Sequence, residues 1–384
     1  MNLRRVAVIA GKEWREIRRD PVFLALAFAL PISWIFIFSY TMIFDIENVP
    51  FAIVDYDHSA RSRDFAHRFI DSRYFDFRGY LNSEHDADRL LAASRMRLIV
   101  TIPEHFARDL AAGRTARIAT TIDGTFPNRA QTVKAYAEAI TRNFSGELQA
   151  RYVSQRFGIA PDRALTLMQP LRLEVRYLYN QGLRSIWSTA PSLVMLTLMF
   201  VPCLLTALVV VREKDNGSIY NIYASTVTRA EFLAGKLLPS VAISYADALI
   251  LSALACFYFG APFKASPGFY LIACLVYVSC TASMGLLVST LVRSQNAALM
   301  ISSILAIIPA IQFSGMVIPV ATLEGGAWVQ AHLFPAMYFE NIVLGSYLKG
   351  VGAARLWVDL LVLAGYAITL MALSHWAFRK RQSR

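Results

Sequence analysis

The 384-residue sequence predicts an α-helical integral membrane protein with six spans, one before and five after an inserted α/β domain. The chain is 56% hydrophobic and 17% charged, whereas soluble domains average about 45–50% apolar and about 25% charged residues. Its net charge is +11, and its lysines and arginines flank apolar runs, as they do in membrane proteins. One long polar stretch, residues 45–185, separates the first apolar run from the others and is long enough to bury its own core.

Residues 1–20 predict an amphipathic helix ahead of the first span. Leu3, Val6, Trp14 and Ile17 recur at helical spacings together with Ala10, and basic residues occupy much of the remaining surface. A basic helix with tryptophan on its apolar side is typical of helices that lie in a membrane interface. We therefore expect this segment to contact membrane lipid.

Residues 21–44 predict the first span. Asp20 and Pro21 form a helix start, with an N-cap followed by proline at the first helical position. The run 22–44 is uncharged and long enough to cross a hydrocarbon core of about 30 Å. It is longer than the apolar region of a signal peptide and no A-x-A-like cleavage site follows, so we expect an uncleaved anchor. Pro31 predicts a bend within it.

Residues 45–185 change to a soluble pattern in which short strands alternate with helices. This alternation predicts a small α/β domain. The expected strands are 51–54, 74–80, 97–102, 117–122 and 171–179, and the expected helices are 59–71, 84–94, 104–112 and 128–157.

Residues 186–378 predict a core of five further spans, followed by a basic tail, 379–384. The spans are expected at 191–211, 237–259, 269–292, 297–313 and 356–378. The run 297–313 is short for a full crossing. Between it and the last span, residues 314–350 are apolar but interrupted by glycine and proline, which predicts a re-entrant helical hairpin.

Basic residues collect on one side of the predicted spans. The short loops of the other side carry only Lys264, Lys349 and Arg355. The positive-inside rule places both termini and residues 212–236 in the cytoplasm and the α/β domain outside it. The residues on the basic side are Arg4, Arg5, Lys12, Arg15, Arg18, Arg19, Arg212, Lys214, Arg229, Lys236, Arg293, Arg379, Lys380, Arg381 and Arg384.

The sequence predicts no catalytic, cofactor or metal site in this chain. No phosphate-binding loop is present, because Gly235-Lys236 lacks both the earlier glycine and the following serine or threonine. The six histidines lack metal-ligand spacing, and the four cysteines lie in apolar runs without C-x-x-C spacing. The basic residues are not interleaved with aromatics as in nucleic-acid-binding proteins. We therefore expect no nucleic-acid partner.

The polar stretch 212–236, between the second and third spans, carries two short motifs. A polar hairpin between two spans is more often a plain solvated loop, but here residues 212–218 read REKDNGS and residues 231–236 read EFLAGK. These residues resemble the signature of ABC-2-type permeases, which is R-E-[KR]-[ED]-x-G-[ST] followed by a closing E-x-x-x-G-K. The usual Thr-Pro between them is replaced by Thr226-Val227. Residues 54–59, VDYDHS, are similar to the bacterial drug-efflux subgroup, and the resemblance covers essentially the whole chain.

The resemblance implies a coupling helix that docks on a separate ATP-binding-cassette subunit, which binds the ATP. It also implies a second permease chain, in a homodimer or heterodimer, and by analogy alone a periplasmic adaptor. The residues expected to couple the ATPase to the membrane are Glu213, Asp215, Asn216, Gly217, Ser218, Tyr220, Asn221, Tyr223, Glu231, Gly235 and Lys236.

Two further residues are expected on a transport path, Asp247 and Gln312. An acid as deep in a span as Asp247 is costly and indicates function. The alternative is a hydrogen bond from a neighbouring serine or tyrosine that only fixes helix packing. Both interpretations remain open at this point.

Taken with the resemblance, these features predict a permease subunit without its own ATPase site, in a bacterial inner membrane. We expect it to export amphipathic or lipophilic, drug-like compounds. Two alternatives share the same features: an exporter of a lipid or glycan, and a membrane receptor or scaffold that senses ligands through its outer domain.

Overall fold

The computed structural model describes residues 2–42, 47–160, 162–163, 166, 176 and 178–378, apart from the side chains of residues 128 and 221–223. It forms two compact units: a helical unit, Met1–Ile43 with Tyr177–Arg384, and a mixed unit, Phe44–Arg176. Each unit is described by itself below.

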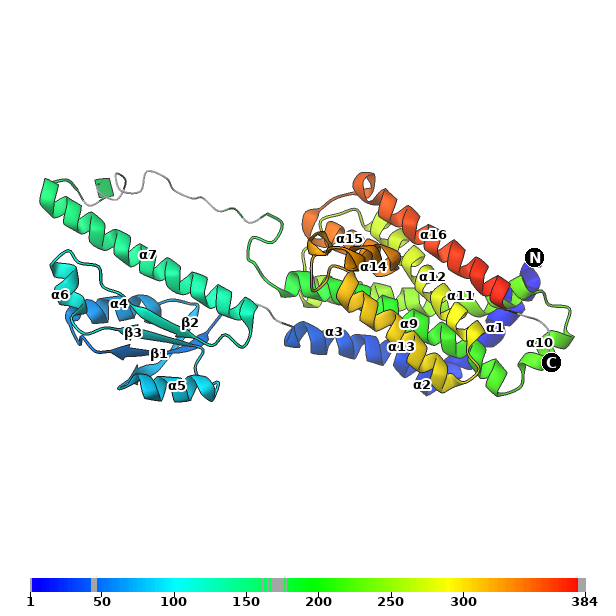
Figure 1. Cartoon of the computed structure of the whole chain (residues 1–384). Helices are drawn as coiled ribbons and strands as arrows, with labels where there is room; N and C mark the ends of the chain where they lie inside the picture. The colour runs from blue at the N-terminus through cyan, green and yellow to red at the C-terminus, as the bar shows by residue number, and fades with distance from the viewer. Residues whose placement is uncertain are drawn as a thin grey trace. The chain divides into compact units, whose positions relative to one another are not determined.

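The helical unit begins with α1 and, in the part of the chain that the structure describes, contains six helices long and apolar enough to cross a membrane (Figure 1). This agrees with the six predicted spans. Helix α1 is Leu3–Arg19. The six apolar helices are α2 with η1 and α3 (Pro21–Leu24, Ala25–Ala29, Leu30–Thr41), α9 (Ile186–Asp215), α11 with η2 (Arg229–Ala253, Leu254–Tyr258), α12 (Pro267–Leu291), α13 (Gln295–Phe313) and α16 (Ala353–Ala377).

The first spanning helix begins where its capping residues predict. The Asp20 carboxylate accepts hydrogen bonds from the backbone N–H groups of Val22 and Phe23, each at 3.0 Å. A π-helical turn, Ala25–Ala29, lies just before Pro31. Proline has no N–H to donate to the preceding turn, so the regular ladder is interrupted where the bend was predicted. The predicted end at residue 44 lies outside the described residues.

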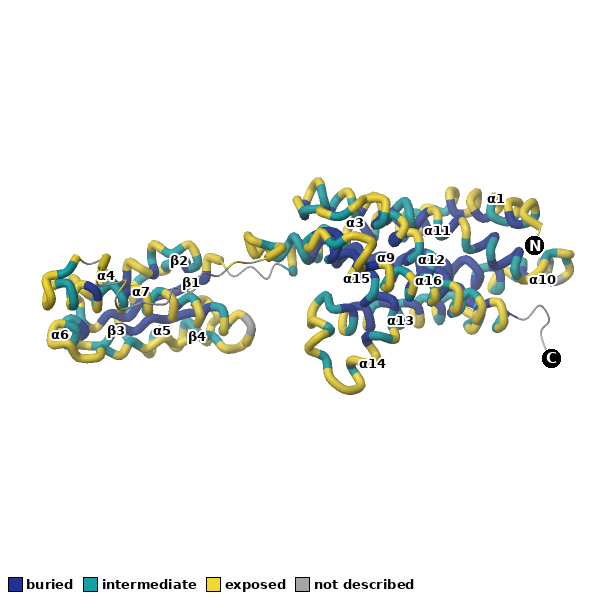
Figure 2. The backbone as a smooth tube through the Cα atoms, turned by 90° about the horizontal axis from the view of Figure 1, so that it is seen from above, coloured by how far each residue is buried: buried dark blue, intermediate teal, exposed yellow. Residues whose placement is uncertain are grey.

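Helix α9 is the central helix of this unit. Its most apolar 18-residue window is entirely buried, and Figure 2 shows it dark blue along most of its length. It packs against α3, α11, α12, α13 and α15. At Gly285 of α12 the two backbones approach so closely that a Cβ atom would lie 2.0 Å from the carbonyl oxygen of Cys203. Small residues permit such contacts between membrane helices.

The predicted re-entrant segment forms a chain of short helices between α13 and α16. They are η3 (Val320–Thr322), α14 (Gly326–Leu333), α15 (Pro335–Leu344) and η4 (Gly345–Lys349). Gly325 precedes α14 and Gly350 follows η4, with φ values of +57° and +66°, in the region that favours glycine. Pro335 lies at the first turn of α15, where its missing N–H has no cost. Entry of this segment into a membrane stays a prediction.

The mixed unit has a four-stranded sheet of order β2-β1-β3-β4. Strand β1 is parallel to both β2 and β3, and β4 is antiparallel to β3. The strands are β1 (Val49–Asp55), β2 (Phe75–Leu81), β3 (Leu98–Ile102) and β4 (Ala119–Ile122), and the helices are α4 (Ala60–Ile70), α5 (Glu84–Ala92), α6 (Phe106–Ala111) and α7 (Pro127–Phe157). The first four predicted strands are confirmed. Most of the fifth, 171–179, lies outside the described residues.

Helices cover both faces of this sheet, with α4, α6 and α7 on one side and α5 on the other (Figure 1). Phe51 of β1 packs toward Phe65 and Phe69 of α4, whereas Ala52 and Val54 pack toward α5. A strand buried on both faces is apolar at successive positions rather than at alternate ones. This explains the continuous apolar pattern of β1.

The Gly285 contact gives a stability prediction. Gly285→Ala should lower the free energy of unfolding by about 1–3 kcal/mol or more, because an added methyl group overpacks the α9–α12 contact. The matched control is Gly365→Ala on α16, where a Cβ meets no atom within 4 Å and alanine favours the helix. Thermal unfolding of the detergent-solubilised protein measures both variants. Equal stabilities would contradict the close packing of α9 on α12.

Candidate functional site

The predicted coupling segment lies at one end of the helical unit, and most of it is helical. Residues 212–215 form the last turn of α9, α10 (Ile219–Ala224) follows, and α11 begins at Arg229. Figure 1 shows α10 close to the start of α1. Gly217 joins α9 to α10 with φ +70°, a conformation that other residues rarely adopt. The motif is therefore a continuation of the spanning helices.

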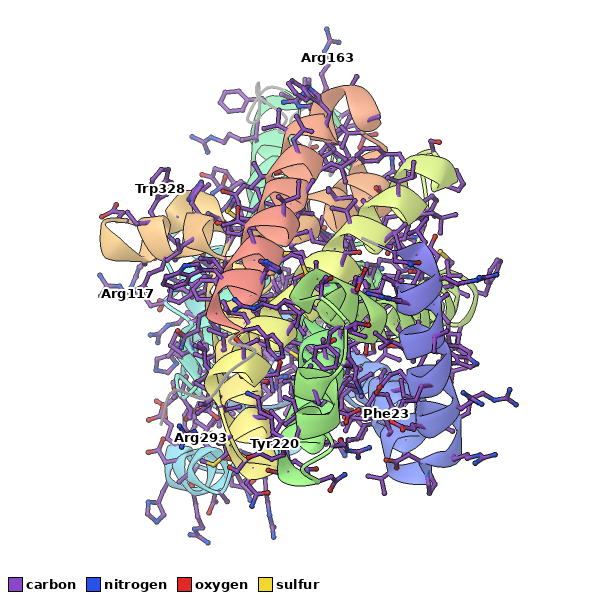
Figure 3. The ribbon with its side chains drawn as sticks, turned by 90° about the vertical axis from the view of Figure 1, so that its right-hand side faces the viewer. Phe23, Arg117, Arg163, Tyr220, Arg293 and Trp328 are labelled. Carbon is purple, nitrogen blue, oxygen red and sulfur yellow. The ribbon has the colours of Figure 1, made fainter. Side chains whose placement is uncertain are left out.

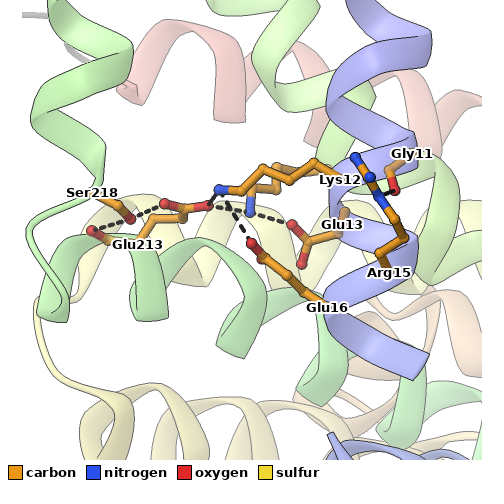
Figure 4. A network of polar contacts seen from close by, with 8 residues as sticks. Gly11, Lys12, Glu13, Arg15, Glu16, Glu213 and Ser218 are labelled. Atoms are coloured by element: carbon orange, nitrogen blue, oxygen red, sulfur yellow. Dashed lines mark hydrogen bonds and ion pairs between the residues drawn. The ribbon is translucent and has the colours of Figure 1, made fainter. Parts of the chain in front are cut away.

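Glu213 lies at the centre of a buried charge network that joins α9 to α1 and α11 (Figure 4). Its Oε1 accepts hydrogen bonds from Lys236 Nζ at 2.7 Å and from Lys12 Nζ at 3.0 Å. Ser218 Oγ donates to its Oε2, and Lys236 also contacts Glu13. Glu213 and Lys236 are only 5% and 2% exposed. Burial raises the pKa of Glu13, and the charge of Lys236 opposes that shift.

The flanking basic residues of the motif bind other helices. Arg212 forms an ion pair with Asp20, the residue between α1 and α2. Lys214 Nζ donates to backbone carbonyls at the end of α12, including Thr290 at 3.2 Å and Val292 at 2.9 Å. A cation at the C-terminus of a helix is favoured by the exposed carbonyls and the helix dipole. Together with the contacts of Glu213, these interactions join the end of α9 to α1, α11 and α12.

The start of α11 is bound to α1 through Glu231 and packs closely on it at Gly235. Thr228 and Glu231 form a capping box, in which each side chain accepts a hydrogen bond from the other residue's backbone N–H. Glu231 also accepts from the backbone N–H of Asn2 at 2.6 Å. At Gly235 a Cβ atom would lie 2.7 Å from the Ile9 side chain, so only glycine allows α1 to approach α11 this closely. Glu231 and Gly235 are therefore buried residues that hold α11 against α1, not part of an exposed surface.

The exposed part of the docking face for the ATPase is smaller than predicted. That face was expected to comprise Glu213, Asp215, Tyr220, Asn221 and Tyr223. Asp215, Asn216 and Tyr220 are exposed, with Tyr220 at 56%. Figure 3 shows the Tyr220 side chain at this end of the helical unit. The side chains of Asn221 and Tyr223 lie outside the described residues. Glu213 was expected on this face but is buried, because the ammonium groups of α1 and α11 hold it inside.

A groove of about 640 Å³ runs beside the charge network, between α1 and the end of α9. Carboxylate oxygens of Glu13, Glu16 and Glu213 lie within 4.8 Å of one another there, an arrangement that could hold a cation. Lys12 and Lys236 already contact these three carboxylates. The protein's own ammonium groups therefore supply the positive charge that a metal ion would bring.

The two transport-path residues lie in different surroundings. Asp247 on α11 is fully buried, and among the described residues neither of its carboxylate oxygens has a hydrogen-bond partner. Ser244, three residues earlier, is likewise buried with its hydroxyl unpartnered in the described structure. The packing alternative required such a hydrogen bond and finds no support here. Gln312 on α13 is exposed.

Two acids of this unit were missed by the sequence analysis. Glu13 is seven residues after Val6 and four before Ile17, so it lies on the buried face of α1. Its spacing could have identified it as an acid on an apolar stripe. Glu340 lies within the predicted re-entrant segment, is 1% exposed and contacts Ser192 of α9. An acid in that apolar segment was a usable signal.

Comparison with known proteins agrees with these features. Residues 21–376 match the protein family described as ABC-2 family transporter protein. The chain is 28% identical over 383 residues to the probable multidrug ABC transporter permease YbhS of Escherichia coli, covering 100% of this chain and 98% of that protein. It is 25% identical over 379 residues to the probable multidrug ABC transporter permease YbhR (98% and 99% covered) and 23% identical over 383 residues to the inner membrane transport permease YhhJ (99% and 98% covered), both from Escherichia coli.

The family match spans the six apolar helices up to residue 376 and includes Glu213, Ser218 and Lys236 of the charge network, whereas α1 precedes the matched residues. The chain therefore belongs to the ABC-2 family of transporter proteins and is a permease of an ABC transporter, a role that implies an ATPase subunit as its partner.

Proposed function

We propose that this permease exports amphipathic or lipophilic, drug-like compounds across a bacterial inner membrane, driven by ATP bound to a separate ATPase subunit. The observation that carries the proposal is the connection of the last turn of α9 to α1, α11 and α12 through Arg212, Glu213 and Lys214. A displacement of α10 by the ATPase then moves several helices together. The relatives named as multidrug permeases support the substrate class.

The coupling surface in this proposal consists of α10 and the exposed residues beside it. Asp215, Asn216 and Tyr220 offer charge, hydrogen-bonding groups and an aromatic ring to the ATPase. Asp215 also accepts a hydrogen bond from Gln295 Nε2 at 3.0 Å, so the same residue reaches the start of α13. Gly217 and Ser218 keep α10 at a set angle to α9. Asn221 and Tyr223 belong to this surface by their place in α10.

The basic residues at this end of the helical unit support a cytoplasmic orientation for both termini and for α10. The mixed unit is then outside the cytoplasm, where it could meet a periplasmic adaptor. Leu3, Val8 and Trp14 on α1 are exposed, which supports contact of this helix with membrane lipid.

A second permease chain completes the path in this proposal, as a homodimer or a heterodimer. The exposed face of α13 is apolar at Ile304, Ile308 and Ile311, and Gln312 adds an amide to it. An amide facing lipid is unfavourable, whereas an amide facing a second chain or a wet path is not. Asp247, buried within one chain, becomes accessible to substrate when the helices around α11 move.

The complex itself tests the proposal. The permease, purified with an ATPase subunit that has a phosphate-binding loop and no spans, should hydrolyse ATP faster when a transported compound is added. Stimulation by a lipid or glycan alone would instead favour the corresponding alternative exporter. A permease that neither binds an ATPase nor moves any compound would contradict the proposal.

Glu213→Ala should uncouple ATP hydrolysis from transport while leaving membrane insertion intact. Loss of a buried charge-assisted hydrogen bond costs about 1.5–3 kcal/mol, so transport-coupled hydrolysis should fall about tenfold or more. The control is Glu16→Ala, which removes an exposed carboxylate that pairs with Lys12 at 3.4 Å but, in the described structure, forms no ion pair with Lys236. Transport and ATP hydrolysis are measured for both variants in the reconstituted permease–ATPase complex. Wild-type coupling in Glu213→Ala would refute the role of the network.

Asp247→Asn should change the rate of transport by about tenfold for some compounds of a panel, because it removes a buried carboxylate that has no hydrogen-bond partner in the described structure, without changing the shape of the side chain. The control is Asp359→Asn, which replaces a half-buried acid that has Asn341 Nδ2 at 3.4 Å. Transport assays across the panel compare the two. Unchanged rates for every compound would favour a packing role for Asp247.

A further inference from the structure

In a buried contact between Glu340 of α15 and Ser192 of α9, two acceptor oxygens lie near one serine hydroxyl proton. Ser192 Oγ lies 2.9 Å from the backbone carbonyl oxygen of Ser188 and also contacts Glu340 Oε1. A serine hydroxyl has one proton and can donate it to one of these acceptors only. Serines within helices commonly donate to the carbonyl four residues earlier, as to Ser188 here. The proton shared with Glu340 then comes from the Glu340 carboxyl group.

The rest of the Glu340 environment leads to the same assignment. Its other oxygen, Oε2, is buried and has no hydrogen-bond partner among the described residues. An ionised carboxylate with an unpartnered oxygen and no cation beside it is strongly disfavoured in a protein interior. A neutral carboxylic acid that donates to Ser192 fits this geometry, whereas an ionised carboxylate does not.

Aromatic packing holds this carboxyl group at the junction of three helices. The adjacent Phe339 stacks on Tyr277 of α12, with ring centroids 4.0 Å apart and planes 11° apart. Tyr277 in turn donates to the backbone carbonyl of Met195 in α9 at 3.3 Å. Movement of α15 away from α9 would break the contact with Ser192 and expose a carboxyl group where α9, α12 and α15 meet.

The buried charges of the helical unit favour a positive ligand at this place. Among the buried residues that the structure describes, Lys236 is the one cation, and Glu13 and Glu213 neutralise it. Asp247 and Glu340 are the buried acids of this unit with unpartnered carboxylate oxygens in the described structure. Once ionised, both would attract a cation and repel an anion.

We propose that Glu340 determines substrate specificity by binding the positive charge of a cationic amphipathic compound when α15 separates from α9. The carboxyl proton leaves to water in the opened path, and the cationic group of the substrate takes its place beside the carboxylate. When the helices close again, the substrate leaves, and Glu340 takes up a proton and contacts Ser192. This inference rests on the proposed export function and narrows its substrates to cations.

The test uses two ions of nearly equal size and shape but opposite charge, tetraphenylphosphonium and tetraphenylborate, with the neutral steroid progesterone as a third probe. The readout is stimulation of ATP hydrolysis by the reconstituted permease–ATPase complex. We expect wild type to respond to tetraphenylphosphonium at least about tenfold more strongly than to tetraphenylborate. Glu340→Gln, which keeps a hydrogen-bonding side chain of the same shape, should abolish that preference. Glu324→Gln, at an exposed acid of the same segment, should retain it.

Ser192→Ala gives a second readout that does not alter the carboxyl group. It removes the contact that holds the closed state, so half-maximal stimulation by tetraphenylphosphonium should occur at a lower concentration. A purely structural role would shift the response to all three probes equally. That result, or an unchanged charge preference in Glu340→Gln, would overturn the inference. Stimulation by progesterone without any preference between the ions would overturn it and leave the export function standing, whereas no stimulation by any probe would count against both.

Discussion

The buried charge network around Glu213 is the constraint on which the helical unit depends. Lys236 is almost completely buried between Glu213 and Glu13, so it cannot leave either carboxylate without exposing an uncompensated charge to the protein interior. The three residues come from α1, α9 and α11. These helices must therefore move together at their coupled ends, and any force applied to the short helix α10 reaches all of them.

Helix α9 extends this constraint to the other end of the unit. About twenty residues separate Ser192 from Arg212, which corresponds to about 30 Å along a helix. At one end α9 is bound to α1 and α11 through Glu213, and at the other it contacts α15 through Ser192 and Glu340. Between them, Gly285 lets α12 pack directly on its backbone. A single buried helix thus connects the surface proposed for the ATPase with the carboxyl group proposed for the substrate.

The position of Glu213 also changes the interpretation of the family motif. As a surface residue it would contribute one contact to a partner subunit. As a buried residue it holds three helices of its own chain together, while the exposed Asp215 and Asn216 of the motif, with Tyr220 beside it, form the surface proposed for the partner. The motif therefore has two roles. Its buried positions hold the ends of the spans together, and its exposed positions form the surface proposed for the ATPase.

Local patterns in the sequence were enough to determine the apolar helices, the Asp20 cap, and the order of the first four strands with their helices, because each depends on residues only a few positions apart. Tertiary structure alone decided the partners of the charged residues. Lys236 meets Glu13 across 223 positions of the chain, and Glu340 meets Ser192 across 148. Periodicity shows which face of a helix is apolar, but it does not show which acid on one helix meets which cation or hydroxyl group on another. That pairing depends on how the helices pack, and packing turned Glu213 from an expected surface residue into the centre of the site.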